Sequence, residues 1–571
     1  MVGLFKRCVI IVAAAALLPL FPVTAALQPP APESGPPRGK GNYADLVRLF
    51  EEFRTWKAAV PVVGQLSDNP RITSIPDNRP AAVAKRRTRL AEFMRQVENM
   101  NVVIWNRSQQ ADYLVVRSQL NQELFELEVS RPWERDPGYY VDRMLSVTFV
   151  DLPITGIALK DSRKNLRDIP VLVDQAKRTL RNVPADYADL ALHNLVNADG
   201  VGHGHPYRSS PPAGVLGWYD DLLAQVSRQS ELRPEVTAAR TAVIDFQNWL
   251  KQQRPRMTAQ AGVGEPNFNW YLKQVKLLPY TAAELLILGD RETKRLWSMH
   301  ALEKHRNRKL PELMPAETAK EYADRISRTE KRVRSFLKNQ EIITVPSNIG
   351  ELHVNVPFIV RPGGRNFWEE IQYRDPSPDI LHATLPGHSF DGLMAERITH
   401  PIRKHISDGV RIEGWGVYLE EGAQRLGYFE DIPRVRELID LFGIFRAVRV
   451  AGDVNLQLNR WTVDQTIKEW RDWTPWLDPN VARVDAEIYL RRPPGYGLGY
   501  TVGMIEMQKL LADRKHQMGD KFVLKDFHDA FMAQGRIPMS LIRWEMTGSD
   551  DEVRSFWKHD PLPKTGKTSQ R

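Results

Sequence analysis

The sequence predicts a mainly α-helical protein with a small β element. Apolar residues recur every three or four positions over most of residues 42–340, for example in 43–53 and 238–250, which is typical of helices that bury one face. Two stretches, Thr281–Glu284 and Thr462–Gln465, have the pattern of a capping box, in which the first side chain caps a helix and the last reaches back to it. Helices therefore dominate both halves of the chain.

The evidence for strands is more limited. Apolar and polar residues alternate in 341–345 and in 352–360, and this alternation indicates extended structure with one buried face. After these segments the helical spacing resumes, most clearly in 435–449. We therefore expect a small sheet near the middle of the sequence.

The N-terminus has the layout of a secretory signal peptide. Lys6 and Arg7 precede about fifteen apolar residues, and small residues suited to cleavage follow near position 26. The apolar run is too short to be a typical spanning helix. We predict a signal peptide over residues 1–26, a Pro/Gly-rich linker over 27–41, and an exported protein that is periplasmic or extracellular.

Cysteine usage restricts the chemistry of the mature chain. Cys8 is the only cysteine, and it lies before most of the apolar run, whereas a lipid-bearing cysteine would follow that run. Cleavage would leave no cysteine, so the mature chain can form no disulfide. Any metal must then be bound by histidine and carboxylate side chains.

The mature chain is long enough for more than one lobe. We predict a helical N-terminal part over 42–344, a C-terminal part over 345–548 that carries the site, and a polar tail over 549–571. No later apolar run approaches twenty residues, so no transmembrane segment is expected after signal removal. The basic clusters 84–89 and 304–309 are interpreted as solvated helix faces, and no nucleic-acid partner is expected.

The stretch ILHATLPGHSFDG, residues 380–392, is the strongest candidate for a metal site. His382 and His388 are six residues apart, and on an uninterrupted helix they would point about 120° apart. Pro386 would clash with the carbonyl group of His382 if the helix continued, and Gly387 permits backbone paths closed to other residues. A turn at Pro386–Gly387 can therefore bring the two imidazoles together.

A carboxylate ligand is available 25 residues after His388, in RIEGWGVYLEE, residues 411–421. Glu413 and Glu420 are seven residues apart, so both would lie on one face of a helix. Each histidine or glutamate alone is more often structural than functional. Their combination with the Pro-Gly turn favours a metal site with three protein ligands and one open position.

These residues resemble a known family. HATLPGH followed by EGWGVYLEE is similar to the bacterial "domain of unknown function 885" family of zincin-like metallopeptidases, whose pattern is His-Glu-x-x-Pro-Gly-His followed by Glu-Gly-Trp-Ala-Leu-Tyr. Residues 445–453, 492–503, 519–529 and 537–541 also resemble later segments of that family. The likeness covers about residues 265–548.

The resemblance implies a multi-helix zincin-like architecture and a peptide-like substrate or ligand. It implies that His382, His388 and Glu413 bind zinc. It also implies that Tyr500 faces the site, where its phenol could stabilise an oxyanion.

The family pattern is broken at three polar positions. Where the family has the glutamate that acts as general base, this chain has Ala383, which cannot accept a proton. Gln457 replaces a family histidine, and Thr501 replaces a lysine. Three such changes together favour reduced or altered chemistry.

Three hypotheses remain open. The first is an active zinc hydrolase of peptide or amide bonds whose base is supplied by Glu420, Glu421 or Asp391; Glu420 and Tyr500 are then the candidate catalytic residues. The second is a non-catalytic descendant that acts as a binding protein of the cell envelope. The third is a hydrolase of activated esters or amides that needs no separate base.

Other histidines and the tryptophans are weaker candidates. His203 and His205 form a pair without accompanying carboxylates, whereas His400 and His405 are interpreted as helix-end or surface residues. The stretch 526–529 is interpreted as part of an amphipathic helix with its polar residues outside. Five tryptophans in the C-terminal part are expected mostly in the core, and any that line a cleft would suit a ligand with apolar side chains: Trp415, Trp461, Trp470, Trp473 and Trp476.

Overall fold

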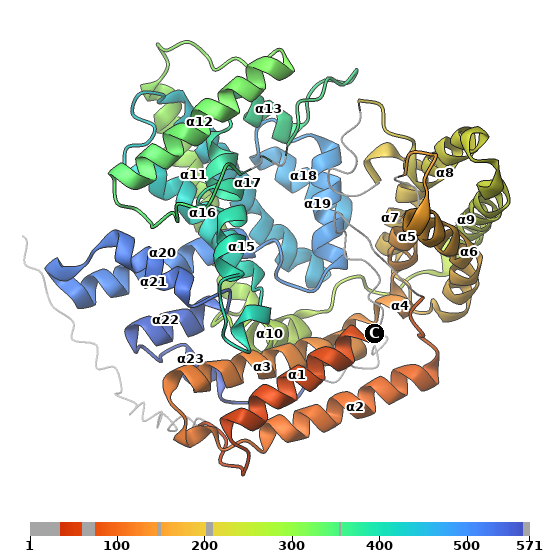
Figure 1. The fold of residues 1–571 in the computed structure, drawn as a ribbon, viewed down its shortest axis with the longest axis horizontal. Helices are drawn as coiled ribbons and strands as arrows, with labels where there is room; N and C mark the ends of the chain where they lie inside the picture. Colours follow the sequence, from red (N-terminus) through yellow and green to blue (C-terminus); the bar gives the residue numbers. More distant parts are fainter. Residues whose placement is uncertain are drawn as a thin grey trace, which may run out of the picture.

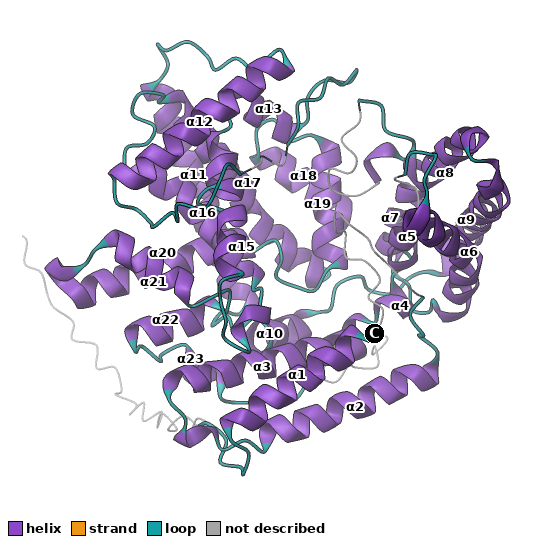
Figure 2. Ribbon diagram, in the orientation of Figure 1, coloured by secondary structure: helices purple, strands orange, loops and turns teal. Residues whose placement is uncertain are grey.

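The computed structural model describes residues 35–59, 75–145, 150–200, 209–352, 354 and 356–563. The mainly α-helical prediction is confirmed, because the secondary structure of these residues consists of helices, turns and isolated bridges (Figure 2). The predicted signal peptide lies outside the described residues, as do residues 27–34 of the predicted linker and 564–571 of the predicted tail. Among the described helices, none combines the length and the apolar character needed to cross a membrane.

The first part of the chain forms nine helices with the following bounds: α1 (Tyr43–Ala58), α2 (Pro80–Glu98), α3 (Arg107–Phe125), α4 (Pro132–Arg135), α5 (Gly138–Leu145), α6 (Gly156–Thr179), α7 (Ala185–Val196), α8 (Gly214–Gln225) and α9 (Arg233–Gln253).

The remaining described helices have these bounds: α10 (Glu265–Gln274), α11 (Ala282–Arg306), α12 (Ala319–Asn339), α13 (Phe367–Arg374), α14 (Ser377–Asp379), α15 (His388–Ala395), α16 (Gly409–Arg425), α17 (Arg434–Gln457), α18 (Val463–Trp473), α19 (Pro479–Arg491), α20 (Gly499–Met518), α21 (Leu524–Ala533), α22 (Met539–Thr547) and α23 (Val553–Phe556).

Helix starts follow the predicted capping signals. Thr281 accepts a hydrogen bond from the backbone N–H of Glu284, and the Glu284 carboxylate returns one to the backbone of Thr281, so α11 begins with a complete capping box. Thr462 and Gln465 form the same reciprocal pair at the start of α18. These bonds satisfy backbone donors that have no partner inside the helix, which is why both starts could be predicted from sequence.

The two largest clusters of buried hydrophobic side chains belong mainly to different groups of helices. Helices α5–α9 form a bundle with its own core, in which Trp218, Tyr219 and Phe246 are fully buried. The larger core contains residues of α1–α3 together with residues from the C-terminal helices. In Figure 1, α1–α3 lie along one edge of the molecule, whereas α15, α16 and α17 lie near its centre.

The predicted small β element is wrong for the described residues. Glu341 has a left-handed φ of 48°, which interrupts an extended path, and residues 341–345 form a turn. In the second predicted strand, 352–360, side chains form hydrogen bonds with the described backbone, and no neighbouring strand does so. Glu330 accepts from the N–H of Leu352, and Tyr373 donates to the carbonyl of Pro357. These bonds satisfy backbone groups of the described residues that a sheet partner would otherwise bond.

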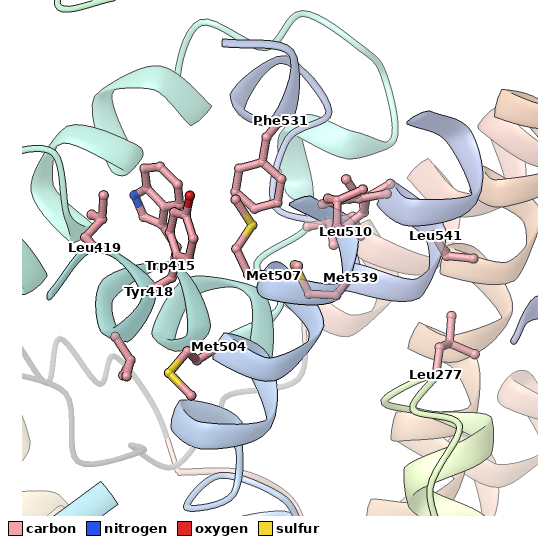
Figure 3. Close-up of a cluster of buried hydrophobic side chains, with 14 of the residues drawn as sticks. Leu277, Trp415, Tyr418, Leu419, Met504, Met507, Leu510, Phe531, Met539 and Leu541 are labelled. Atoms are coloured by element: carbon pink, nitrogen blue, oxygen red, sulfur yellow. The ribbon is translucent and has the colours of Figure 1, made fainter. Parts of the chain in front are cut away.

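Helices α16 and α20 cross closely beneath the candidate site. A Cβ atom added at Gly503 would lie 2.1 Å from the carbonyl oxygen of Val410, so only glycine permits this approach of the two backbones. Figure 3 shows Trp415 and Tyr418 of α16 near Met504 and Met507 of α20, within the larger core. This close contact fixes the position of α16, and with it the positions of the side chains that α16 carries.

Candidate metal centre

The backbone between the two histidines does not continue as a helix. His382 lies in a single wide π-helical turn, Ile380–Thr384, which follows α14 directly. Leu385 is extended, the peptide bond to Pro386 is cis, and α15 begins at His388. The predicted interruption at the proline is therefore confirmed, and it brings the two imidazole rings to 4.6 Å between centroids.

Gly387 is necessary for this turn. A Cβ atom there would lie 1.8 Å from the carbonyl oxygen of His382 and 2.7 Å from that of Leu381. The backbone folds back on itself at this point more closely than any larger residue allows. The side chains of the π turn and of α15 consequently face the same space.

Glu413 completes the group from α16. Its Oε2 lies 3.2 Å from Nε2 of His382 and 3.1 Å from Nε2 of His388. One ligand atom from each residue lies within 4.8 Å of the others, and no other group of this kind occurs in the described part of the chain. Asp408 caps the N-terminus of α16 by accepting from the N–H of Arg411, which fixes the first turn of the helix, directly before Glu413.

The electrostatics of the group favour an ionised carboxylate. Burial opposes the charge of Glu413, but the nearby His388 and the hydrogen bonds from both histidines hold the pKa of Glu413 well below its ordinary value. Burial and the charge of Arg446 lower the pKa of His382, but hydrogen bonds to Glu413 and Glu420 outweigh them and raise it. A metal cation bound between these three side chains would therefore contact an ionised carboxylate.

Glu420 and Arg446 contact the far side of His382. Glu420 Oε1 lies 2.9 Å from Nδ1 of His382, while Glu420 Oε2 forms an ion pair with Arg446 of α17. An Nη atom of Arg446 lies 3.3 Å from the same Nδ1. A carboxylate on the outer nitrogen of a ligand histidine fixes the ring and its tautomer. Glu420 therefore lies where it can orient the ring of His382, and not beside Nε2, the nitrogen that faces Glu413.

Asp379 is a further carboxylate near the histidines. It ends α14, three residues before His382 and four before Ala383, and its Oδ2 is buried with no partner among the described residues. Burial raises the pKa of Asp379 to about 6; the charge of Glu420 adds to the shift, and the charges of His382, Arg446 and His388 oppose it. A half-ionised carboxylate close to neutral pH is suited to proton transfer.

Tyr500 lies next to the group, at the start of α20. Its ring stacks on that of His382 with 6.3 Å between centroids, and the guanidinium of Arg449 lies 4.8 Å from its centroid. Burial and the charge of Glu413 raise the pKa of Tyr500 well above its ordinary value, so the phenol stays protonated and can donate a hydrogen bond. Asp453 holds the approach to α20 by accepting from the backbone N–H of Gly497.

The other two carboxylates considered as bases are engaged elsewhere. Asp391 is paired with Arg411 at 2.5 Å and with Arg536 at 2.7 Å. Glu421 pairs with Arg295 at 2.7 Å. Both are therefore parts of ion pairs that hold helices together.

The weaker candidates take other places. His203 and His205 lie outside the described residues. His400 accepts from the backbone N–H of Arg403 at 3.3 Å and is about one-third exposed, and His405 ends a short 3-10 turn, as expected of helix-end residues. The expectation that 526–529 keeps its polar residues outside is wrong for His528. Its ring is buried between Tyr418 and the backbone carbonyl of Ile342, because it can bond both at once.

Sequence reasoning missed two residues of the site. Asp379 could have been found, because a residue four positions before Ala383 lies one helical turn away on roughly the same face. Arg446 carries no such signal. It lies 64 residues after His382 and reaches the site only through the packing of α17 against α16.

Comparison with known proteins finds a family match over the site region and a shared fold. Residues 379–546 match the model of a family described as "Bacterial protein of unknown function (DUF885)". No curated protein sequence matches the chain. Two solved structures share the fold over almost the whole chain.

The first is described as "a putative lipoprotein of unknown function from Shewanella oneidensis". It is 16% identical with a TM-score of 0.66, covering 89% of this chain and 100% of that one. The second is "the putative lipoprotein from Colwellia psychrerythraea", 16% identical with a TM-score of 0.65, covering 88% of this chain and 97% of that one. At this identity the likeness shows the fold alone. The family match covers the site region: residues 379–546 are similar to the DUF885 family of bacterial proteins of unknown function.

Proposed function

We propose that the protein is an exported, metal-dependent hydrolase of peptide or amide bonds with a zincin-like site. The observation that carries this proposal is the convergence of His382, His388 and Glu413, whose ligand atoms lie within 4.8 Å of one another. Two imidazoles and one carboxylate form a ligand set used by catalytic zinc, which leaves a fourth position open. The signal-like residues 1–26 and the lipoprotein descriptions of the two structural relatives support a location in the cell envelope.

The donor atoms fit a small divalent cation. Ligand distances of about 2.0–2.1 Å in a tetrahedron separate the ligand atoms by about 3.3 Å. The Nε2–Oε2 distances of 3.2 and 3.1 Å in this site are close to that separation. Zinc held there would polarise the substrate carbonyl and acidify water. Glu420 Oε1 lies 2.9 Å from Nδ1 of His382, so the tautomer that carries its proton on Nδ1, facing Glu420, would leave Nε2 free for the ion.

Asp379 is the group best suited to replace the missing glutamate. It stands one turn before Ala383, and its Oδ2 has no hydrogen-bond partner among the described residues. In the proposed reaction, water attacks the carbonyl carbon as Asp379 Oδ2 takes a proton from it. The carbon–nitrogen bond then breaks, and the same oxygen returns the proton to the leaving amine. Tyr500 donates a hydrogen bond to the oxygen that becomes negative.

The proposal is tested by metal content and turnover together. Protein prepared without chelator should contain one transition metal ion per chain, and it should cleave members of a peptide library. His388→Ala, which removes one ligand, should abolish both. Protein that neither contains nor takes up a metal ion would overturn the proposal.

A second candidate function is a non-catalytic binding protein of the envelope. Ala383 favours it, because this residue replaces the family's general base. Gln457 favours it too, because it replaces a family histidine and its side-chain amide donates to the backbone carbonyl of Tyr489 at 2.7 Å. Ala383→Glu separates the two functions. A silent parent that gains peptidase activity in Ala383→Glu would favour the binding protein, whereas turnover by the parent that His388→Ala abolishes would favour the hydrolase.

A further inference from the structure

A second cavity lies outside the metal centre, between α11 and α17. Its volume is about 300 Å³, at the small end of the range for small-molecule sites. Helix α13 contributes its last residue to the wall, and the loop between α18 and α19 contributes Pro475 and Trp476. Part of the wall is apolar, because it is formed by Leu438 and Leu441 of α17, which are almost fully buried.

Two tryptophans form the sides of this cavity. Trp297 is fixed by donating its indole N–H to the backbone carbonyl of Trp473 at 2.9 Å. Trp476 is 48% exposed although it is large and apolar, and its φ of 67° lies in the left-handed region that only glycine adopts freely. Arg374 holds that ring, with its guanidinium 4.9 Å from the ring centroid. An exposed aromatic ring held in a strained backbone is a common feature of ligand sites.

His300, which lines the cavity, has an unsatisfied polar atom. Its side chain is 6% exposed, and its Nδ1 is buried without a partner among the described residues. Burial and the charge of Lys304 hold the pKa of His300 below its ordinary value, so the ring is neutral at neutral pH. A neutral imidazole has one donor and one acceptor nitrogen, so the unpartnered Nδ1 can accept a hydrogen bond in one of the two tautomers.

Lys304 provides a cation at the rim. It lies one helical turn after His300, lines the cavity, and forms no ion pair with any carboxylate that the structure describes. The two carboxylates of the lining share one guanidinium. Glu437 accepts from Arg434 at 3.0 Å, and Glu312 lies 3.3 Å from the same guanidinium. With Lys304 and Arg374 included, the lining holds three cations and two carboxylates, which gives it a formal charge of +1.

We infer that this cavity binds the C-terminal residue of a peptide, or an N-acylated amino acid, with an aromatic or branched aliphatic side chain. The side chain would lie between Trp297 and Trp476, the amide N–H would donate to Nδ1 of His300, and the carboxylate would pair with Lys304. Each feature of this ligand class matches one unsatisfied feature of the cavity. The inference concerns a different site from the proposed reaction and does not depend on it.

Calorimetric titration with N-acetyl-L-phenylalanine tests the inference, with its C-terminal amide and 3-phenylpropionate as matched probes. The free acid should bind, and the amide should bind about tenfold more weakly because it lacks the charge that pairs with Lys304. 3-Phenylpropionate, which lacks the N–H for His300, should also bind more weakly. Absence of binding by the acid at millimolar concentration would overturn the inference.

Two variants locate the binding. Lys304→Met should weaken the acid about tenfold and leave the amide unchanged, whereas Lys338→Met, an exposed lysine on α12, should change neither. Trp476→Ala should weaken both probes, and its side chain is exposed enough for the fold to survive. If Lys304→Met bound the acid as tightly as the parent, the proposed site would be wrong. Loss of acid binding after treatment with EDTA would also contradict it, because the carboxylate would then be bound at the metal.

Discussion

At the scale of single residues, the candidate metal centre depends on where side chains are absent. Gly387 lets the chain turn tightly after the cis proline, and Gly416 leaves room on α16 for the ring of His382. A Cβ atom at Gly416 would lie 2.6 Å from Nδ1 of that ring. The histidines can approach Glu413 only because these two residues have no side chain.

Gly387→Ala should therefore destabilise the protein strongly. The added methyl group would overlap the carbonyl of His382 at 1.8 Å, so the turn must open. We expect the free energy of unfolding in urea to fall by roughly 3 kcal/mol or more, with loss of metal binding. Gly350→Ala is the control, since a Cβ there meets nothing within 4 Å, and it should change stability by no more than about 0.5 kcal/mol.

Asp379→Asn should remove proton transfer without removing the metal. Loss of a general base lowers the rate by roughly 10²–10⁴-fold, and we expect this loss in kcat/KM with unchanged metal content. The base works only when ionised, so activity of the parent should rise with pH through about 6, the raised pKa of Asp379. The variant should lack that rise.

The control for this experiment is Asp472→Asn, an exposed residue of α18 paired with Lys468, which should leave turnover unchanged. If Asp379→Asn keeps the parental rate and pH profile, another group takes the proton.

At the scale of elements, the crossing of α16 and α20 determines the site. Glu413 stands on α16 and Tyr500 on α20, and the two helices meet backbone to backbone at Gly414 and Gly503. The apolar side chains around the crossing hold the helices in register, as Figure 3 shows. The position of Glu413 relative to the histidines therefore depends on this contact.

Gly503→Ala should separate the two helices. Its Cβ would lie 2.1 Å from the carbonyl oxygen of Val410, and such overpacking costs about 1–3 kcal/mol of unfolding free energy. Because α16 shifts, metal affinity should fall as well, which calorimetry can measure. Gly422→Ala lies on α16 in open space and should instead stabilise the helix by up to about 1 kcal/mol. Equal effects of the two substitutions would contradict the proposed role of the crossing.

At the scale of the whole molecule, buried polar groups tie distant parts of the chain together. His528 of α21 bonds Tyr418 of α16 at 2.9 Å and the carbonyl of Ile342 at 2.7 Å. A partly exposed ion pair also joins distant segments: Lys273 of α10 lies 2.8 Å from Asp560, which follows α23. These bonds span long sequence distances, so they should break together when the protein unfolds.

His528 should make stability depend on pH. Burial lowers the pKa of His528 to about 4, whereas the unfolded chain has the ordinary value of about 6.5. Between these values the unfolded state binds a proton that the native state does not, so stability falls as pH falls from about 6.5 to about 4, by roughly 3 kcal/mol. Urea unfolding of His528→Gln, which cannot titrate, should show a smaller fall over this range. An identical pH dependence in both proteins would contradict this.

Local signals in the sequence were sufficient to predict the helices and to name the candidate ligand residues. Capping boxes and apolar spacing involve residues within four positions of one another, and these contacts exist whatever the rest of the chain does. The strands at 341–345 and 352–360 could not be judged in this way. The alternation was real in both, but the described backbone of the second segment is bonded by Glu330 and Tyr373, whose positions depend on α12 and α13. In the first segment, the backbone N–H of Thr344 donates to Asp529 of α21.

The sequence by itself determined a mainly helical chain, its helix starts, and a His-His-Glu set interrupted by Pro-Gly. Only the tertiary structure decided that these three side chains meet, that Glu420 and Arg446 stand behind His382, and that Asp379 is left with an unpaired oxygen. The reason is physical. Periodicity is set by neighbours along the helix, whereas a contact between residues 64 positions apart depends on how whole helices pack.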